Sequence, residues 1–235
     1  MVSVIPFNTD NTYLAREFLM KDPYKNARMY SLLENDRGNS LIIYDGGVIR
    51  GILAVDENKM EMWFYGNRGS FKVAIENIDL NNNSSLFIDS KNLDIAKRKF
   101  RIQCSPVLAM RLKIRDYVCK SGNARKVTLE DSKEYIATFG VVPNENTFIK
   151  TLDGKIVGVA SVLSYNIKIC VIGCIKYDMG NEESISDIVS SIVNEYKTLT
   201  ENIVVYVVYE EKLKDILEKQ GFAYSGELLK LYKSE

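Results

Sequence analysis

The chain has 235 residues, 46% hydrophobic and 26% charged, which is typical of a globular protein with room for one large domain or two smaller ones. Lys and Arg number 31 and Asp and Glu also 31, so the formal net charge is zero, which argues against a nucleic-acid binder that neutralises many phosphates. No histidine is present, which excludes Ser–His and Cys–His catalysis and removes the commonest metal ligand, so we expect no metal site.

The first half of the chain shows the strand and helix pattern of a small α/β domain. Residues 2–7 are predicted as a strand, followed by helices up to Glu34 with an apolar stripe at helical spacing. Asp45-Gly46-Gly47 is a strong hairpin signal. The other expected elements are strands at 41–44, 48–55 and 60–65, a helix at 71–78, a strand at 85–88, a helix at 93–100 and a strand at 107–113.

The second half repeats this order after a polar crossing at 116–122. Residues 167–177 are almost wholly apolar, as expected of a strand buried on both faces. The other expected elements are strands at 125–129, 146–152, 155–165, 202–209 and 228–233 and helices at 132–139, 184–198 and 212–220. We therefore predict two units, at 1–116 and 122–235.

The two halves also match residue by residue. Residues 47–55 align with 154–162, and the offset is 158 − 51 = 107. The offset grows to 222 − 100 = 122 where Phe100 aligns with Phe222, which indicates small insertions in the second half. These matches predict a duplicated domain; the alternative is that two unrelated α/β domains share the same rhythm.

Three segments of the second half carry a family resemblance. Residues 125–131 resemble the opening strand and helix cap of the GNAT N-acetyltransferases, 153–160 the central hairpin, and 217–222 the closing helix with its Gly-Phe corner. The resemblance covers about 125–233, and it reaches 1–113 only through the internal repeat. It implies an α/β (α+β) fold of two tandem GNAT-like units, each with a mixed, mostly antiparallel sheet flanked by helices.

The resemblance also implies a chemistry. In this family acetyl-coenzyme A lies between the central strand and the next one, and an amine attacks its thioester directly without a metal. A backbone N–H near the end of the central strand polarises the thioester, here at Cys174 or Ile175. The pyrophosphate sits on N–H groups of the following loop and helix start, as helix termini favour. The residues implied there are Gly180, Asn181 and Ser184, and Tyr177 and Tyr209 are candidate acids.

The loop of the second half departs from the family pattern. Residues 178–184 contain one glycine and no arginine, and Glu182 and Glu183 stand where an anion would dock. Both carboxylates also suit the first turn of a helix. The position of the family's usual tyrosine acid is Leu217 here, and Ala96 in the first half.

The corresponding loop of the first half is chemically different. It reads Gly66-Asn67-Arg68-Gly69-Ser70, so two glycines, an arginine and a serine lie at a strand-to-helix turn. Such a loop is able to hold an anion, because glycine lets a ligand approach the backbone and arginine adds charge. The alternative is an ordinary tight turn in which Ser70 caps the helix.

Two functions therefore compete. The first is an acetyl-coenzyme A-dependent N-acyltransferase acting on a small-molecule or peptide amine; the second is a non-catalytic GNAT-like binding or interaction module.

Asn8, Asp10 and Asn11 interrupt any signal-peptide pattern, and no apolar run is long enough to cross a bilayer. We expect a cytoplasmic protein with reduced thiols, without nucleic-acid or membrane partners, and able to form a homodimer.

Overall fold

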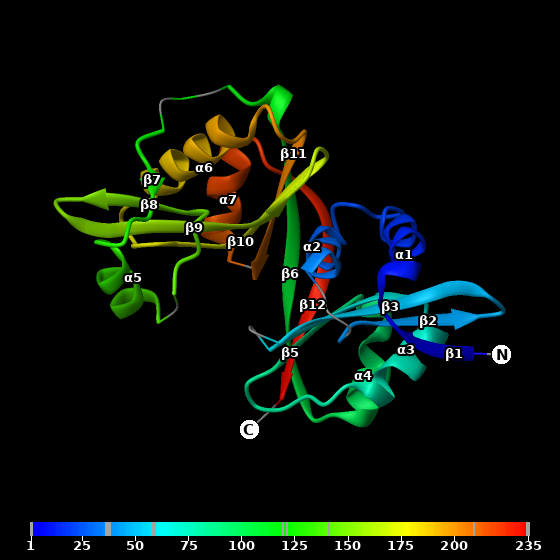
Figure 1. Cartoon of the computed structure of the whole chain (residues 1–235). Coiled ribbons are helices and arrows are strands. Elements are labelled where there is room, and N and C mark those ends of the chain that lie inside the picture. Colours follow the sequence, from blue (N-terminus) through cyan, green and yellow to red (C-terminus); the bar gives the residue numbers. More distant parts are fainter. Residues whose placement is uncertain are drawn as a thin grey trace. The chain divides into compact units, whose positions relative to one another are not determined.

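The computed structural model describes residues 2–35, 39–57, 60–118, 120, 122–140, 142–208 and 210–233. Its contacts divide the chain into two compact units (Figure 1). Unit 1 comprises Met1–Leu108 together with Gly226–Glu235, and unit 2 comprises Ala109–Ser225. Within the described residues, no helix is long and apolar enough to cross a membrane.

Unit 1 is a mixed sheet with helices beside it. Its strand order is β1-β2-β3-β4-β5-β12, followed by β6, and β4 and β5 run parallel while β1–β2, β2–β3, β3–β4 and β5–β12 are antiparallel. The elements are β1 (Val2–Pro6), α1 (Thr12–Leu19), α2 (Ala27–Asn35), β2 (Leu41–Asp45), β3 (Val48–Asp56), β4 (Glu61–Gly66), α3 (Arg68–Ala74), β5 (Ser85–Ile88) and α4 (Leu93–Lys99), with short 3-10 turns at Thr9–Asn11, Ile75–Asn77 and Ser90–Asn92. The strands β6 (Ile102–Lys113) and β12 (Ala223–Lys233) belong partly to unit 1 and partly to unit 2, and the 3-10 turn at Ile114–Asp116 belongs to unit 2.

The core of unit 1 lies between its sheet and the helices α3 and α4. Phe64 of β4 and Phe71 of α3 have ring centroids 4.9 Å apart, and both side chains are almost fully buried. Trp63, the chain's single tryptophan, stacks on Phe87 of the neighbouring strand. Its fluorescence therefore reports on the folding of unit 1.

Unit 2 repeats the same arrangement. Its strand order is β6-β11-β10-β9-β8-β7, and β10–β11 is the parallel pair while β9 pairs antiparallel with β10 and β8. The elements are β7 (Arg125–Lys126), α5 (Ser132–Phe139), β8 (Thr147–Leu152), β9 (Lys155–Tyr165), β10 (Ile169–Tyr177), α6 (Glu183–Tyr196), β11 (Asn202–Val208) and α7 (Glu211–Lys219).

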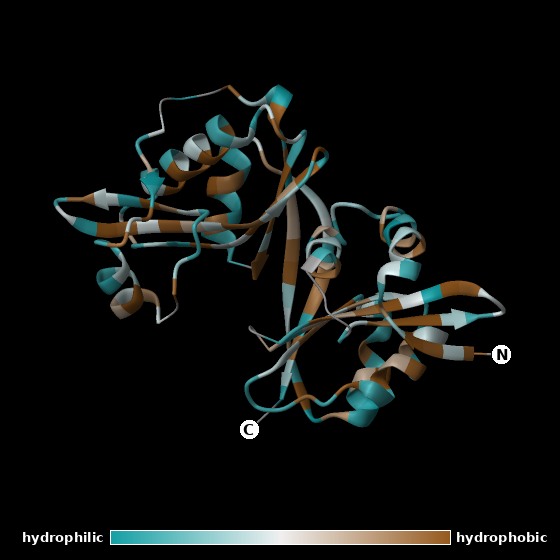
Figure 2. Cartoon of the chain, in the orientation of Figure 1, coloured by the Kyte–Doolittle hydropathy of each residue, from teal (hydrophilic) through white to brown (hydrophobic). Residues whose placement is uncertain are grey.

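The long helix α6 behaves as its sequence pattern predicts. Ile185, Ile188, Val189, Ile192 and Val193 recur at helical spacing and are all completely buried. Figure 2 shows hydrophobic residues along β9 and β10 and on α6. The thiol of Cys170 in β10 is also buried, and burial raises its pKa to about 12, so it stays protonated and inert near neutral pH.

The last strand differs from the expectation. The sequence predicts it at 228–233 within a unit at 122–235, but β12 begins at Ala223, and the residues from Gly226 onward are part of unit 1. There Leu229–Leu231 pair with Leu86–Ile88 of β5. The compact units therefore do not coincide with the two sequence repeats. Strand exchange of this kind leaves no local signal, because the side-chain pattern of a strand does not specify its partner.

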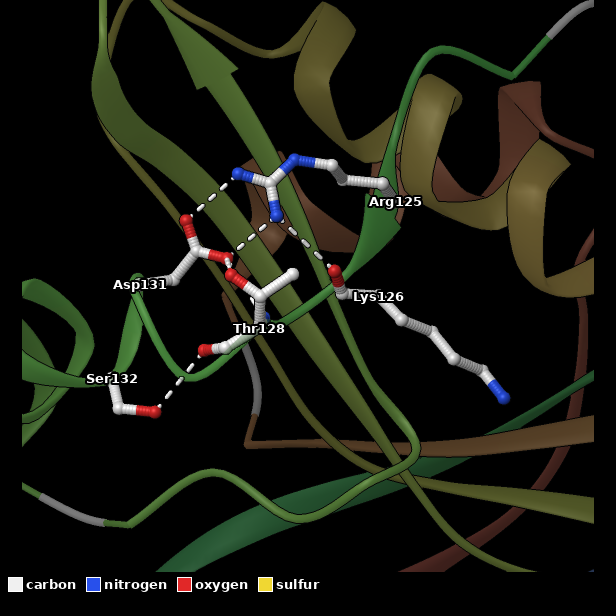
Figure 3. A network of polar contacts seen from close by, with 5 residues as sticks. All are labelled: Arg125, Lys126, Thr128, Asp131 and Ser132. Atoms are coloured by element: carbon white, nitrogen blue, oxygen red, sulfur yellow. Dashed lines mark hydrogen bonds and ion pairs between the residues drawn. The ribbon is translucent and has the colours of Figure 1, made fainter.

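A polar network shortens β7 relative to the predicted strand at 125–129 (Figure 3). The Asp131 carboxylate accepts hydrogen bonds from Nη1 and Nη2 of Arg125, at 2.6 and 2.7 Å, and from the N–H and hydroxyl of Thr128, at 2.8 and 2.7 Å. Because Asp131 takes the Thr128 N–H, the backbone leaves the sheet there and turns into α5. The Arg125 guanidinium, and after it the Thr128 hydrogen bonds, hold the pKa of Asp131 well below its usual range.

Asp131→Ala is expected to lower the free energy of unfolding of unit 2 by about 1 kcal/mol near neutral pH, as for the loss of a carboxylate that accepts charge-assisted hydrogen bonds. Because folding lowers the pKa of Asp131, its contribution is fully present above the unfolded pKa of about 4, and it is lost progressively as the pH falls from there toward the much lower folded-state pKa. Urea unfolding followed by far-UV circular dichroism at pH 7 and pH 3 measures the loss of stability and its dependence on pH. If Asp131→Ala lowered the free energy of unfolding equally at the two pH values, the ionic explanation would be contradicted. Asp131→Asn removes the charge but keeps a hydrogen-bond acceptor, so it separates the two contributions.

Candidate active site

The strands β10 and β11 separate halfway along unit 2. They pair in parallel from Ile169↔Asn202 to Ile172↔Val205, and no pairing follows in the described part of either strand. At the same point the pairing of β10 with β9 is irregular. One register shift falls between Val171 and Ile172 and an opposite one between Ile172 and Cys174, so that Gly173 is passed over in a local bulge. A Cβ on Gly173 would lie 2.5 Å from the Leu163 side chain, so the bulge requires glycine.

Past Ile172, the edge of β10 that faced β11 no longer pairs with β11 in the described part of the chain. Cys174 and Ile175, which the resemblance implies as thioester-binding residues, follow the bulge directly and pair with Ser161 and Ala160 of β9. In a strand, alternate N–H groups face opposite edges, so some N–H groups past Ile172 face the edge that β11 has left. The structure therefore places the predicted residues at the opening between the two strands.

The loop after β10 is tied to β9 and to itself. The Asp178 N–H donates to the Val157 carbonyl at 2.8 Å, the Asn181 N–H to the Asp178 carbonyl at 3.0 Å, and the Ser184 N–H to the Asn181 carbonyl at 2.9 Å. Two of the predicted pyrophosphate-binding groups, at Asn181 and Ser184, are thus used within the loop. Gly180 has φ +99°, and a Cβ there would meet no atom within 4 Å, so its backbone is open to a ligand.

Glu182 brings a negative charge onto this loop. Its carboxylate lies 2.5 Å from Nζ of Lys212, the second residue of α7. The hydrogen bond from Lys212 lowers the pKa of Glu182, and backbone N–H groups of Glu182 itself and of Gly180 lower it further. The carboxylate is therefore ionised near neutral pH and lies against N–H groups that an anionic ligand would need.

The structure describes Tyr177, one of the two tyrosines predicted as acids, but not the other. Tyr209 lies outside the described residues. The Tyr177 hydroxyl donates to Glu210 at 3.4 Å, and burial, then Glu210, raises the pKa of Tyr177. Tyr177 lies four residues past Gly173 (177 − 173), or about 13 Å along an extended strand, so it stands beside the loop rather than the bulge. Its role as an acid stays a prediction.

Tyr206 is a tyrosine whose position on its strand lies nearer the bulge. It follows Val205, the last residue of β11 that pairs with β10, and it is partly exposed. The sequence does not single out Tyr206 as an acid, because no local pattern shows where two strands separate.

Unit 1 has the same separation, but the pairing of its central strand β4 with β3 has no bulge. Its strands β4 and β5 pair from Glu61↔Ser85 to Trp63↔Phe87 and then diverge. The pairing of β3 with β4 continues through six pairs, from Gly51↔Gly66 to Asp56↔Glu61, without a register shift. Unit 1 therefore lacks the irregular backbone that unit 2 places at its opening.

The polar groups of the unit 1 loop mostly hold the loop itself. Gly66 allows a close approach, because a Cβ there would lie 2.6 Å from the Arg50 carbonyl oxygen and from Gly51 Cα. The Asn67 side chain accepts from the Ser70 N–H at 2.8 Å, and the Ser70 hydroxyl donates toward the Arg50 carbonyl at 2.7 Å. Gly66, Asn67 and Ser70 thus form a tight turn, but the residue that caps the helix is Asn67 and not Ser70 as the sequence predicts.

Arg68 forms a bridge between two helices of unit 1. Its Nη1 and Nη2 each lie 2.7 Å from an oxygen of Asp94, so α3 is joined to α4 by a bidentate ion pair, and Nη1 also donates to the Lys91 carbonyl. The Arg68 hydrogen bonds lower the pKa of Asp94 to about 2.

The loops of the two units share a set of contacts. In each, an N–H after the central strand donates to a carbonyl of the preceding strand, Asn67 to Arg50 at 3.1 Å and Asp178 to Val157 at 2.8 Å. In each, a glycine faces a serine hydroxyl, 2.6 Å from the Cβ position in the pair Gly51/Ser70 and 2.7 Å in Gly158/Ser184. The acceptors differ by 157 − 50 = 107, the offset of the sequence repeat, which supports the internal repeat.

Comparisons with known proteins agree on the fold. No protein-family model matches the chain, and no curated protein matches it in sequence. A GCN5-related N-acetyltransferase from Sphaerobacter thermophilus matches with TM-score 0.64 and 10% identity over 98% of this chain and 95% of that one. A GCN5-related N-acetyltransferase-like protein from Streptococcus suis matches with TM-score 0.65 and 9% identity over 96% and 99%.

A third solved structure shares the tandem organisation. It is a tandem GNAT protein from the clavulanic acid biosynthesis pathway, with TM-score 0.55 and 10% identity over 98% of each chain. The chain therefore has the fold of the GNAT N-acetyltransferases in two tandem units, as the resemblance implied. At this level of identity the likeness concerns the fold.

Proposed function

We propose that unit 2 is an N-acyltransferase that uses acetyl-coenzyme A and acetylates a small-molecule or peptide amine by direct attack. The observation that carries this proposal is the bulge at Gly173, which lies where β10 and β11 separate. A bulge beside an opening presents backbone N–H groups that the sheet does not use. Such fixed donors stabilise negative charge developing on a carbonyl oxygen.

The backbone of unit 2 is compatible with a bound coenzyme A thioester. The loop after β10 is compatible with its pyrophosphate only after the Glu182 side chain moves. When bound, acetyl-coenzyme A supplies an activated acyl group. Residues of β10 past Gly173 would orient and polarise it, and the open backbone at Gly180 would meet the pyrophosphate. Glu182 has the same sign of charge as a pyrophosphate and must turn away. Its side chain is 38% exposed and that of Lys212 53%, so both are free to rotate toward solvent.

Lys212 is the proposed cationic partner of the pyrophosphate. Once Glu182 turns away, the Lys212 ammonium is left beside the loop and is available to the pyrophosphate. It would supply the positive charge that the family's loop arginine supplies and that residues 178–184 lack. The acid that protonates the leaving thiolate is proposed as Tyr206, because its position on β11 adjoins the bulge.

A second candidate function is a binding module without catalysis. The observation that favours it is the Glu182 carboxylate, which already lies on the N–H groups of the loop. If Glu182 does not turn away, the GNAT fold of unit 2 holds no coenzyme.

Calorimetric titration of the full chain with acetyl-coenzyme A, followed by an assay of thiol release with a panel of amines, tests the two functions. Binding together with amine-dependent thiol release supports acyl transfer, and binding without release at any amine supports the module. No heat at high micromolar ligand would contradict the acyltransferase proposal. Tyr206→Phe is expected to lower kcat at least tenfold with unchanged affinity for acetyl-coenzyme A. An unchanged kcat would remove Tyr206 as the acid.

A further inference from the structure

Lys176 of β10 lies on the same side of the unit 2 sheet as α5. Its partner on β9 is Val159, which packs with Tyr135 of α5 in a buried cluster. The Lys176 ammonium lies over the ring of Phe139, the last residue of α5, with Nζ 5.6 Å from the ring centroid. The Lys176 side chain is exposed, and among the described residues it forms no ion pair. We call this side of the sheet the α5 face.

The loop that we propose for the pyrophosphate belongs to the opposite face. Tyr177 follows Lys176 and pairs with Gly158, and a Cβ on Gly158 would lie 2.7 Å from the hydroxyl of Ser184 in α6. Because successive side chains of a strand point to opposite faces, Tyr177 is on the side of α6 and Lys176 is on the α5 face. Figure 1 shows α5 and α6 on opposite sides of β9 and β10. A coenzyme held by the loop before α6 therefore leaves the α5 face to the attacking amine.

Lys176 is also close to the opening along its own strand. It lies two residues past Cys174 (176 − 174), or about 7 Å in an extended strand, and the pairs from Cys174↔Ser161 to Lys176↔Val159 are regular. A lysine carries its ammonium on a flexible four-carbon stem. The contact with Phe139 is a weak interaction at an exposed site, so the ammonium is able to leave the ring for an anion. The cation is thus within reach of a substrate at the opening.

The position that corresponds to Lys176 in unit 1 is covered by a helix. In each unit, the glycine that faces a serine hydroxyl pairs with a residue of the central strand, Gly66 in unit 1 and Tyr177 in unit 2. The residue before it is Tyr65 in unit 1 and Lys176 in unit 2. The Tyr65 ring packs against Phe18 of α1, with the centroids 5.4 Å apart. Unit 2 therefore has an exposed cation where unit 1 has a neutral aromatic residue, and such a cation attracts an anionic group of a substrate.

We propose that the amine acetylated by unit 2 carries a carboxylate next to its amino group, as an amino acid does, and that the Lys176 ammonium binds this carboxylate on the α5 face. The inference rests on the proposed function, because it names the acceptor class of the same site. The short distance from Cys174 to Lys176 favours a carboxylate close to the amine over one at the far end of a long chain.

Lys176 would place the amine without taking part in the bond changes. The amine nitrogen forms a bond to the acetyl carbon, the carbon–sulfur bond breaks, and one proton is lost by the nitrogen while one is gained by the leaving thiolate. The carboxylate stays unchanged throughout. Its ion pair with Lys176 fixes the position of the nitrogen, and an ammonium–carboxylate contact is a charge-assisted hydrogen bond.

The standard amino acids, each tested beside the amine that lacks its carboxylate, such as phenylalanine beside phenethylamine, are the probes. For the wild-type chain we expect kcat/KM to be at least tenfold higher for the amino acid, as one hydrogen bond to a charged group provides. Lys176→Gln should raise the KM for the amino acid about tenfold, leave kcat within about twofold and abolish the preference, whereas Lys176→Arg keeps a cation and should retain it. The matched control is Lys155→Gln, which replaces an exposed lysine at the start of β9 and should change neither constant. Far-UV circular dichroism verifies that the variants fold.

A binding measurement separates this inference from the proposed function. Calorimetry with the preferred amino acid on the full chain saturated with coenzyme A, which carries no acetyl group, should show about tenfold weaker binding to Lys176→Gln. Amino acids acetylated no faster than the amines that lack their carboxylate, or equal losses in Lys176→Gln and Lys155→Gln, would overturn the inference and leave binding of the coenzyme by unit 2 standing. Weaker binding of acetyl-coenzyme A itself to Lys176→Gln would also overturn it, because the lysine would then contact the coenzyme. If the wild-type chain binds no acetyl-coenzyme A, the proposed function and this inference are both overturned.

Discussion

Gly66→Ala is expected to lower the free energy of unfolding of unit 1 by about 3 kcal/mol, the upper part of the range for inserting a methyl group into a filled space. The new Cβ would lie 2.6 Å from the Arg50 carbonyl oxygen, 2.6 Å from Gly51 Cα and 2.8 Å from the Ser70 hydroxyl. Two of these are backbone atoms in paired strands, so neither is able to move aside without disturbing the pairing of β3 with β4. Urea unfolding followed by Trp63 fluorescence measures the loss.

The matched control for this substitution is Gly69→Ala, three residues further along the chain. Gly69 lies in α3 without a positive φ, and its Cβ would meet only the Asn67 side chain at 3.4 Å. Because alanine favours a helix over glycine, stability should stay the same or rise by up to about 1 kcal/mol. Similar losses in the two variants would show that crowding at Gly66 is not the cause.

Glu182→Gln is expected to bind acetyl-coenzyme A at least tenfold more tightly than the wild-type chain. The substitution removes a charge of the same sign as the pyrophosphate from N–H groups of the loop and releases Lys212 from its ion pair. Two like charges about 5 Å apart repel by about 1 kcal/mol in water and by more near a protein surface, and about 1.4 kcal/mol corresponds to tenfold in affinity.

Glu183→Gln is the control, because Glu183 neighbours Glu182 at the start of α6 but forms no ion pair with any described residue. We expect it to change the affinity far less. Lys212→Gln should weaken binding even in the Glu182→Gln background, since the ammonium is then lost as a phosphate partner. An affinity that is unchanged in Glu182→Gln would contradict both the loop placement of the pyrophosphate and the role of Lys212. Because salt screens these charges, the gain should shrink at high ionic strength.

Local side-chain patterns determined most of the elements of this protein. The apolar stripe of α6 is predicted from spacing alone, and the hairpin turns at Asp45-Gly46-Gly47 and Asp153-Gly154 have the positive φ that their sequence requires at Gly46, Gly47, Asp153 and Gly154. The GNAT-like order of strands and helices follows from these signals, since each depends on residues a few positions apart.

The tertiary structure decided the features that depend on distant residues. The exchange of β12 into unit 1 depends on which strand lies beside β5, and the place where β10 and β11 part depends on a bulge whose glycine fits against Leu163 of another strand. The Glu182 carboxylate on its own loop, and the Arg68–Asp94 bridge between α3 and α4, likewise join separate elements. Periodicity specifies which face of an element is buried, whereas pairing partners, bulges and ion pairs depend on what the fold brings alongside it. The order of elements was therefore readable from the sequence, and the chemistry of each loop was not.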